Sequence, residues 1–298
     1  MKKIINSIIS TMALAALFLT ACGSVPKSSD NGLRVLASTT ILADITQNIA
    51  GDRLKIDSLL PDGADPHAYQ AAPSDVAKIT ESKLLILNGL KYETFIKSLL
   101  ENTGGERLVI EATAGLSPRE AAGSVDPHMW LDPNLVITYV KNIRAGLIQV
   151  DPAGAEIYKA NADNYITQLK ELDAWIVEQV NSIPAGRRLL VTNHEAVGYF
   201  AERYGFIVVG AVIPSMSTEA GTSAKEMVAL IEQIKAVNAP AIFLGKVENP
   251  NLANQIAAET NIKVVNDLYL ESLTKGAPAG TYIDMMKHNV TRIVDGLK

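Results

Sequence analysis

The chain has 298 residues, a formal net charge of −5 and a hydrophobic fraction of 48%. No cluster of basic residues follows the N-terminal segment, so the sequence gives no support to a nucleic-acid-binding role. The single cysteine excludes an intramolecular disulfide framework.

The N-terminal segment has the features of a bacterial lipoprotein signal. Lys2 and Lys3 give a positive start, and a short apolar run over residues 4–19 ends in small residues before Cys22. This pattern predicts that residues 1–21 are removed and that Cys22 is lipidated. Residues 22–32 are small and polar, as expected of a flexible tether between a lipid anchor and a folded domain.

Short apolar runs separated by helical stretches indicate an α/β fold. The runs that predict strands are residues 33–38, 54–60, 84–88, 107–110, 188–193, 206–212, 240–245 and 262–266. Their alternation with helices predicts two lobes, each with a four-stranded, mostly parallel sheet flanked by helices. We place the N-terminal lobe at residues 33–150 and the C-terminal lobe at residues 184–298.

Residues 151–183 predict one long, rigid helix that joins the lobes. The segment opens with Asp151 and Pro152, which fits an N-cap followed by proline at the first helical position. Its apolar residues recur at spacings of three, four or eight, so that most fall on one face. They are Ile157, Tyr165, Leu169, Leu172, Ile176 and Val180. About 30 helical residues would span roughly 45 Å.

Three of the four histidines follow predicted strands. His67 and His128 each end an Asp-Pro-His tripeptide after the second and fourth strands, and His194 directly follows the fifth. Ligands of open parallel sheets bind beyond the carboxyl ends of the strands, and imidazole is a common ligand of divalent metal ions. The pattern therefore predicts a metal site. His288 falls within the predicted C-terminal helix and is interpreted as a surface or packing residue.

The Asp-Pro step before His67 and His128 stiffens each loop, which then loses less freedom on binding. The aspartates, Asp65 and Asp126, have two roles open to them. They can cap the local backbone, or they can accept a hydrogen bond from the second nitrogen of the imidazole. The sequence does not distinguish these roles.

Several motifs together resemble the periplasmic zinc/manganese solute-binding proteins of ABC transporters, the cluster A-I metal-binding lipoproteins. They are the lipoprotein-like start, "PDGADPHAY" from Pro61, "DPHMWLDP" from Asp126, "VTNHEAVGYFAERYG" from Val191 and "DLYLESL" from Asp267. The resemblance covers residues 33–298. It implies two α/β lobes bridged by a long helix, with a divalent ion held between them by four side chains and delivered to a membrane permease.

The same resemblance implies which residues bind the ion. His67 and His128 match the ligands of the first lobe, and His194 matches a third position that holds histidine in some members and glutamate in others. The fourth ligand is usually an aspartate in a Tyr-x-Asp-Ser-Leu context, where this chain has Glu271. Asp267 is the alternative, because it is an aspartate and lies closer to the strand end.

Three imidazoles and a carboxylate suit Zn²⁺, so we favour zinc over Mn²⁺ or Fe²⁺ as the transported ion. We expect an extracytoplasmic, monomeric protein that is anchored to the bacterial cell membrane by lipid and delivers the ion to an ABC permease. One alternative is a metal-carrying lipoprotein adhesin. Another is a zinc hydrolase with Glu195 as general base, but a fourth protein ligand would fill the coordination position that a hydrolase leaves open.

Overall fold

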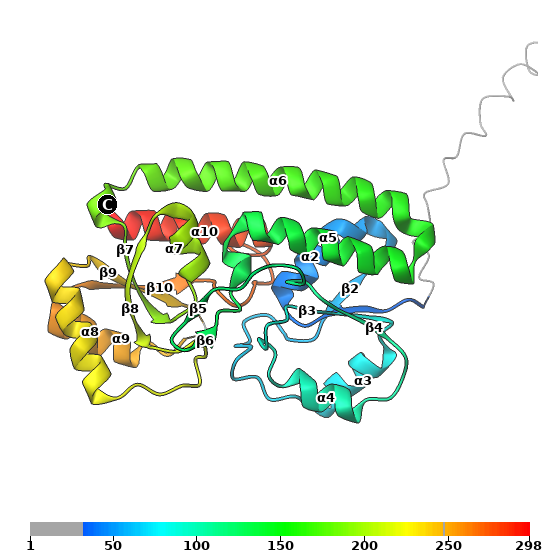
Figure 1. Cartoon of the computed structure of the whole chain (residues 1–298), viewed down its shortest axis with the longest axis horizontal. Coiled ribbons are helices and arrows are strands. Elements are labelled where there is room, and N and C mark those ends of the chain that lie inside the picture. The colour runs from blue at the N-terminus through cyan, green and yellow to red at the C-terminus, as the bar shows by residue number, and fades with distance from the viewer. Residues whose placement is uncertain (1–31, 247) are drawn as a thin grey trace, which may run out of the picture. The chain divides into compact units, whose positions relative to one another are not determined.

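The computed structural model describes residues 32–246 and 248–298, in which two parallel sheets are flanked by helices (Figure 1). The predicted signal segment, Cys22 and residues 22–31 of the predicted tether lie outside the described residues. Within the described part of the chain, no helix is long and apolar enough to cross a membrane.

The N-terminal lobe contains a sheet in the order β2–β1–β3–β4, and all neighbouring strands are parallel. Its strands are β1 (Val35–Ala37), β2 (Ile56–Ser58), β3 (Leu84–Leu87) and β4 (Leu108–Glu111). Its helices are α2 (Thr40–Ala50), α3 (Pro73–Glu81), α4 (Ile96–Asn102) and α5 (Pro133–Val150). The central strand β3 is buried along its whole length, which explains its uninterrupted apolar sequence.

The C-terminal lobe repeats this arrangement, with parallel strands in the order β10–β9–β7–β8. Its strands are β7 (Leu189–His194), β8 (Ile207–Ile213), β9 (Ala241–Gly245) and β10 (Lys263–Leu268). Its helices are α7 (Gly198–Tyr204), α8 (Ala224–Val237), α9 (Asn251–Thr260) and α10 (Tyr282–Leu297). The predicted fold class is confirmed, and every predicted strand is present with ends that shift by two residues or fewer.

The sequence did not predict a small antiparallel hairpin between β4 and α5. It consists of β5 (Glu120–Ala121) and β6 (Ser124–Val125). The turn between them has positive φ angles at both Ala122 and Gly123, the backbone that a tight two-residue hairpin requires. Single 3₁₀ turns occur at η1 (Gly51–Arg53), η2 (Met129–Leu131), η3 (Pro152–Gly154) and η4 (Ala185–Arg187).

The long helix is α6 (Ala155–Asn181), whose 27 residues span about 40 Å. It runs along both lobes and packs on α2 and α5 of one and on α10 of the other (Figure 1). One apolar core cluster likewise continues from the first sheet, under α6, to the second. The residue boundaries proposed for the lobes stay a prediction.

Two details of this helix differ from the prediction. Ile157 is 45% exposed, and Tyr158 is buried instead. Tyr158 precedes Tyr165 by seven residues, about two turns, whereas a spacing of eight turns Ile157 roughly 80° away from that face. Asp151 stands at the N-cap of η3 with Pro152 after it, as predicted, but its side chain does not cap the backbone, because its carboxylate accepts hydrogen bonds from Arg53, at 2.8 Å from Nη2, and from the Tyr158 hydroxyl.

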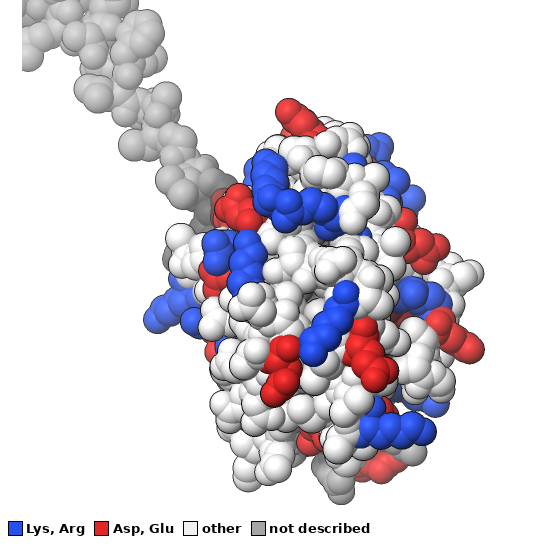
Figure 2. Space-filling model, turned by 90° about the vertical axis from the view of Figure 1, so that its left-hand side faces the viewer, with Lys and Arg blue, Asp and Glu red and all other residues white. Residues whose placement is uncertain are grey.

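The surface around α8 and α9 carries charges of both signs. Figure 2 shows the end of the molecule with these helices, where Lys and Arg side chains are interspersed with Asp and Glu. A nucleic-acid-binding face would show a continuous basic patch, and this face does not.

Candidate metal centre

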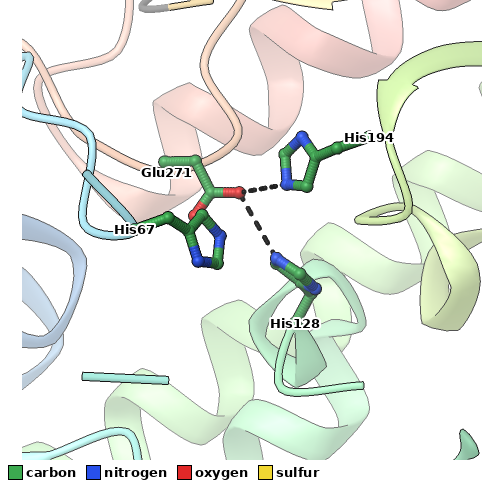
Figure 3. Close-up of side chains that lie close together, drawn as sticks. All are labelled: His67, His128, His194 and Glu271. Carbon is green, nitrogen blue, oxygen red and sulfur yellow. Dashed lines mark ion pairs between the residues drawn. The ribbon is translucent and has the colours of Figure 1, made fainter. Parts of the chain in front are cut away.

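Four side chains from the two lobes, His67, His128, His194 and Glu271, lie close together (Figure 3). His67 lies in the loop between β2 and α3, and His128 lies between β6 and η2. His194 is the last residue of β7, and Glu271 follows the end of β10 by three residues. One potential ligand atom from each residue lies within 4.8 Å of the other three, and no other such group occurs among the described residues.

These four side chains are buried, yet the atoms they direct at one another make no hydrogen bonds. The side chains of His128 and His194 are fully buried, and His67 is only 8% exposed. Within the described part of the chain, Nε2 of each of these three histidines and Oε1 of Glu271 lack a hydrogen-bond partner. Glu271 Oε1 lies 3.2 Å from His194 Nε2 and 3.5 Å from His128 Nε2, the ion pairs drawn in Figure 3. Since buried polar atoms are almost always paired, this arrangement fits a bound cation.

The same kind of hydrogen bond, from the backbone N–H of the histidine to the aspartate two residues earlier, occurs in both Asp-Pro-His loops. Asp65 Oδ1 accepts the backbone N–H of His67 at 2.9 Å, and Asp126 Oδ1 accepts that of His128 at 3.0 Å. Asp126 Oδ1 also lies 2.9 Å from His128 Nδ1, so this aspartate fills both roles that the sequence left open. Asp65 uses its second oxygen differently, and accepts a 2.6 Å hydrogen bond from Thr218 of the C-terminal lobe.

Sequence reasoning missed two residues that contact the cluster. Glu248, in the loop between β9 and α9, places Oε1 2.7 Å from Nδ1 of His194. Tyr92, in the loop between β3 and α4, donates its hydroxyl hydrogen bond to Oε2 of Glu271. Both residues lie beyond the carboxyl end of a strand, and that position is the signal that could have identified them.

The N-terminal lobe also holds the loop that carries Glu271. Trp130 Nε1 donates a hydrogen bond to the carbonyl oxygen of Leu270 at 2.8 Å. Thr40 Oγ1 accepts the backbone N–H of Leu273 at 2.9 Å. These bonds fix the backbone on both sides of Glu271, so the carboxylate is positioned by both lobes.

The electrostatics of the cluster differ from one residue to the next. Burial lowers the pKa of His67 to about 4, and the charge of Glu271 only partly opposes this, so His67 is neutral near pH 7. Burial would also lower the pKa of His194, but the carboxylates of Glu248 and Glu271 outweigh burial and raise the pKa to about 10. Burial would raise the pKa of Glu271, but the imidazoles outweigh it and hold the pKa well below its usual range.

The remaining candidate residues lie outside the cluster. Asp267 accepts a hydrogen bond from Arg292 Nε at 2.8 Å, and its carbonyl oxygen accepts one from His288 Nε2 at 2.8 Å. These contacts join β10 to α10, which gives His288 a packing role. Glu195 donates its backbone N–H to the carbonyl oxygen of Ser215 and is not part of the four-residue group.

A cavity of about 650 Å³ extends from the cluster between the lobes. It reaches His67 and is lined by the β5–β6 hairpin, by residues 90–92 and by residues 215–217 and 219. The cavity offers a route by which an ion can reach the buried imidazoles.

Known proteins are similar to this chain over most of its length. A family model described as "Zinc-uptake complex component A periplasmic" matches residues 35–296. The manganese-binding lipoprotein MntA of Halalkalibacterium halodurans is 35% identical over 302 residues, which cover 100% of this chain and 99% of that protein.

Two solved structures share the fold. The Mn-bound periplasmic metal-binding protein from Candidatus Liberibacter asiaticus matches with a TM-score of 0.80 and 30% identity, over 89% of this chain and 100% of that one. The periplasmic zinc-binding protein TroA from Treponema pallidum matches with a TM-score of 0.83 and 29% identity, over 89% of this chain and 99% of that one. The matching family and the curated relatives are solute-binding components of transporters and not enzymes, which excludes the hydrolase alternative.

Proposed function

Because the chain belongs to the family of periplasmic component A of zinc-uptake complexes, we propose that it captures one divalent transition-metal ion between its lobes and delivers it to an ABC permease. In this proposal His67 and His128 bind the ion from the N-terminal lobe, and His194 and Glu271 bind it from the C-terminal lobe. We propose no ligand role for Asp267, whose carboxylate accepts a hydrogen bond from Arg292.

The observation that carries this proposal is the set of four buried atoms without hydrogen-bond partners, three imidazole nitrogens and one carboxylate oxygen. The other polar atom of three of these side chains is hydrogen-bonded. Glu248 is paired with Nδ1 of His194, Asp126 with Nδ1 of His128, and Tyr92 with Oε2 of Glu271. Metal-binding histidines usually have their second nitrogen paired in this way. Because both lobes supply ligands, binding of the ion stabilises the conformation in which the two lobes are held together.

We further propose that zinc is preferred over manganese and iron. For a given nitrogen-rich site, divalent zinc binds more tightly than divalent manganese or iron, and imidazole suits zinc well. The curated relatives are mainly named for manganese, whereas the family model and the solved structure of TroA are named for zinc. The donor set of this chain is therefore the basis of the preference.

The proposal also includes the attachment of the protein to the cell. Cys22 is the lipidation site, and the small, polar residues after it connect the lipid to the binding domain outside the cytoplasm, where the monomeric protein meets the permease. The lipoprotein-like start of the sequence and the description of the relative as a lipoprotein support this attachment.

Thermal melting of metal-stripped protein tests the function. An ion that binds only the native state at 100 times its Kd stabilises it by about 2.7 kcal/mol. We expect Zn²⁺, Mn²⁺ and Fe²⁺ each to raise the melting temperature, zinc at the lowest concentration, and His67→Ala to abolish these shifts. Failure of all three ions to shift the wild-type melt would refute metal capture. A stronger response to manganese would refute only the zinc preference.

A further inference from the structure

Glu248 is a buried carboxylate whose two oxygens both accept hydrogen bonds. Oε1 lies 2.7 Å from Nδ1 of His194, and Oε2 accepts the backbone N–H of Gly245. The side chains of Glu248 and His194 are both fully buried. Among the described residues, His194 is the only ion-pair partner of Glu248.

We infer that Glu248 is the positioning residue that makes His194 competent to bind metal. A carboxylate can only accept, so it keeps a proton on Nδ1, and Nε2 is the nitrogen that gives up its proton when the ion binds. Its second bond, to Gly245, fixes the rotation of the carboxylate and hence the plane in which the imidazole lies. This inference rests on the proposed function, because it assigns to Glu248 the orientation of one proposed ligand.

Asp126 and His128 form the corresponding carboxylate–histidine pair in the N-terminal lobe, and they differ from Glu248 and His194 in one respect. Asp126 accepts from Nδ1 of His128 in the same way, but it is also paired with Arg119 Nη1 at 3.0 Å. The guanidinium of Arg119 shares the negative charge of Asp126. No arginine or lysine of the described residues shares that of Glu248, so its charge acts on His194 alone.

Packing does not explain a carboxylate at this position. Removing a carboxylate from water is costly unless the charge is paired and hydrogen-bonded. An apolar side chain of similar size would fill the same space without that cost. The two hydrogen bonds of Glu248 therefore point to a requirement set by His194.

Replacing Glu248 with glutamine should move the proton of the neutral His194 imidazole from Nδ1 to Nε2. A glutamine has one acceptor oxygen and one donor amide nitrogen. The backbone N–H of Gly245 can only donate, so the oxygen turns toward it and the amide nitrogen faces Nδ1 of His194. The imidazole then accepts through Nδ1, and its remaining proton lies on Nε2, where it blocks the metal.

Zinc affinity, measured by competition with a chromophoric chelator, tests the inference in the purified chain. Changes in residues that support a metal ligand cost about 10–100-fold in affinity. We expect Glu248→Gln to lose at least tenfold, and to lose more than Glu248→Ala, in which Nδ1 is free to keep its proton. Wild-type affinity in Glu248→Gln, or a loss in Glu248→Ala that equals or exceeds it, would overturn the inference.

Glu93→Gln is the matched control. Glu93 is also buried, but its carboxylate accepts hydrogen bonds from Ser38 Oγ and from the backbone of Asn88 and Gly89. We expect Glu93→Gln to keep wild-type zinc affinity. A loss equal to that of Glu248→Gln would mean that any buried glutamate has this effect, and would also overturn the inference.

Nuclear magnetic resonance of the metal-free protein separates this inference from the proposed function. The ¹⁵N shift of His194 Nδ1 reports whether that nitrogen carries a proton, with no metal present. We expect a protonated Nδ1 in the wild type and an unprotonated Nδ1 in Glu248→Gln. A protonated Nδ1 in Glu248→Gln would overturn the positioning role, whether or not the wild type binds zinc.

Discussion

Thr218 of the C-terminal lobe donates a 2.6 Å hydrogen bond to Asp65 of the N-terminal lobe. The other oxygen of Asp65 holds the backbone of His67. Residues on either side of Thr218 line the cavity that reaches His67. One aspartate therefore links the first Asp-Pro-His loop to the opposite lobe, next to the route by which an ion would leave.

Replacing Thr218 with valine removes this link while keeping the side-chain volume. A hydrogen bond to a charged group contributes about 1.5–3 kcal/mol, so we expect bound metal to dissociate at least about fivefold faster. Stopped-flow transfer of zinc to a chelator measures the rate. Thr222→Val is the control, because the Thr222 hydroxyl has no hydrogen-bond partner. Equal rates for Thr218→Val and the wild type would contradict the link.

The fourth ligand can be assigned with two alanine variants. Glu271→Ala removes the carboxylate whose oxygen lies 3.2 Å from His194 Nε2, so we expect zinc affinity to fall at least tenfold, about 1.4 kcal/mol. Asp267→Ala breaks the contact with Arg292 and should lower stability without changing affinity. Calorimetric titration of both variants gives the comparison. The reverse order of affinities would make Asp267 the ligand.

Gly198 of the C-terminal lobe leaves room for the ion pair between Arg119 and Asp126 of the N-terminal lobe. A Cβ at this position would lie 1.3 Å from Arg119 Nη1, so Gly198→Ala must displace the guanidinium from its 3.0 Å ion pair. Helix propensity alone would favour alanine by about 1 kcal/mol. We expect instead a loss of more than about 2 kcal/mol in the free energy of unfolding, because the buried carboxylate of Asp126 loses its only guanidinium partner among the described residues and keeps only its contacts with His128.

Urea denaturation of Gly198→Ala checks this loss, with Gly186→Ala as its control. A Cβ at Gly186 would meet no atom within 4 Å, so its stability should stay within about 0.5 kcal/mol of the wild type. A Gly198→Ala variant as stable as the wild type would contradict this prediction, because it would show that Arg119 can pair with Asp126 in another conformation.

The buried carboxyl group of Asp44 should make the stability of the protein depend on pH. Its Oδ2 accepts the backbone N–H of Tyr282 at the start of α10, and burial raises its pKa from 3.8 to about 6. The folded protein therefore binds this proton more tightly than the unfolded chain. The charged carboxylate costs stability above the folded pKa, and the cost disappears as the pH falls from about 6 toward 4.

Asp44→Asn keeps an acceptor for Tyr282 and removes this titration. We expect the variant to gain stability over the wild type as the pH rises from 4 to 6, with a constant difference above pH 7. Urea midpoints measured at several pH values give the result. A difference that does not change with pH would show that Asp44 titrates alike in both states.

The strands and the three histidines of the cluster could be predicted from the sequence because their signals are local, whereas Glu271 was indicated by the family resemblance, with Asp267 as the alternative. Each strand is a short apolar run; His194 directly follows one such run, and His67 and His128 lie in loops that follow two others. The hairpin β5–β6 was missed because its strands are two residues each and expose most of their surface. Hydrophobic alternation gives no signal in such short, exposed strands.

Long-range pairing accounts for the rest of what was missed. Asp151 fits an N-cap by sequence, but its carboxylate pairs with Arg53, which is 98 residues away in the chain. Glu248 lies 54 residues from His194, and its position after β9 indicates a candidate site residue but not which residue it contacts. Only the parallel order of β7 and β9 brings these two loops together.

The measurement that tests the central claim most directly is anomalous diffraction at the zinc absorption edge from crystals of the zinc-loaded protein. We predict one strong peak between the lobes, at about 2.0–2.2 Å from Nε2 of His67, His128 and His194 and from a carboxylate oxygen of Glu271. A peak at any other position, or one that lacks any of these four ligands, would contradict the account.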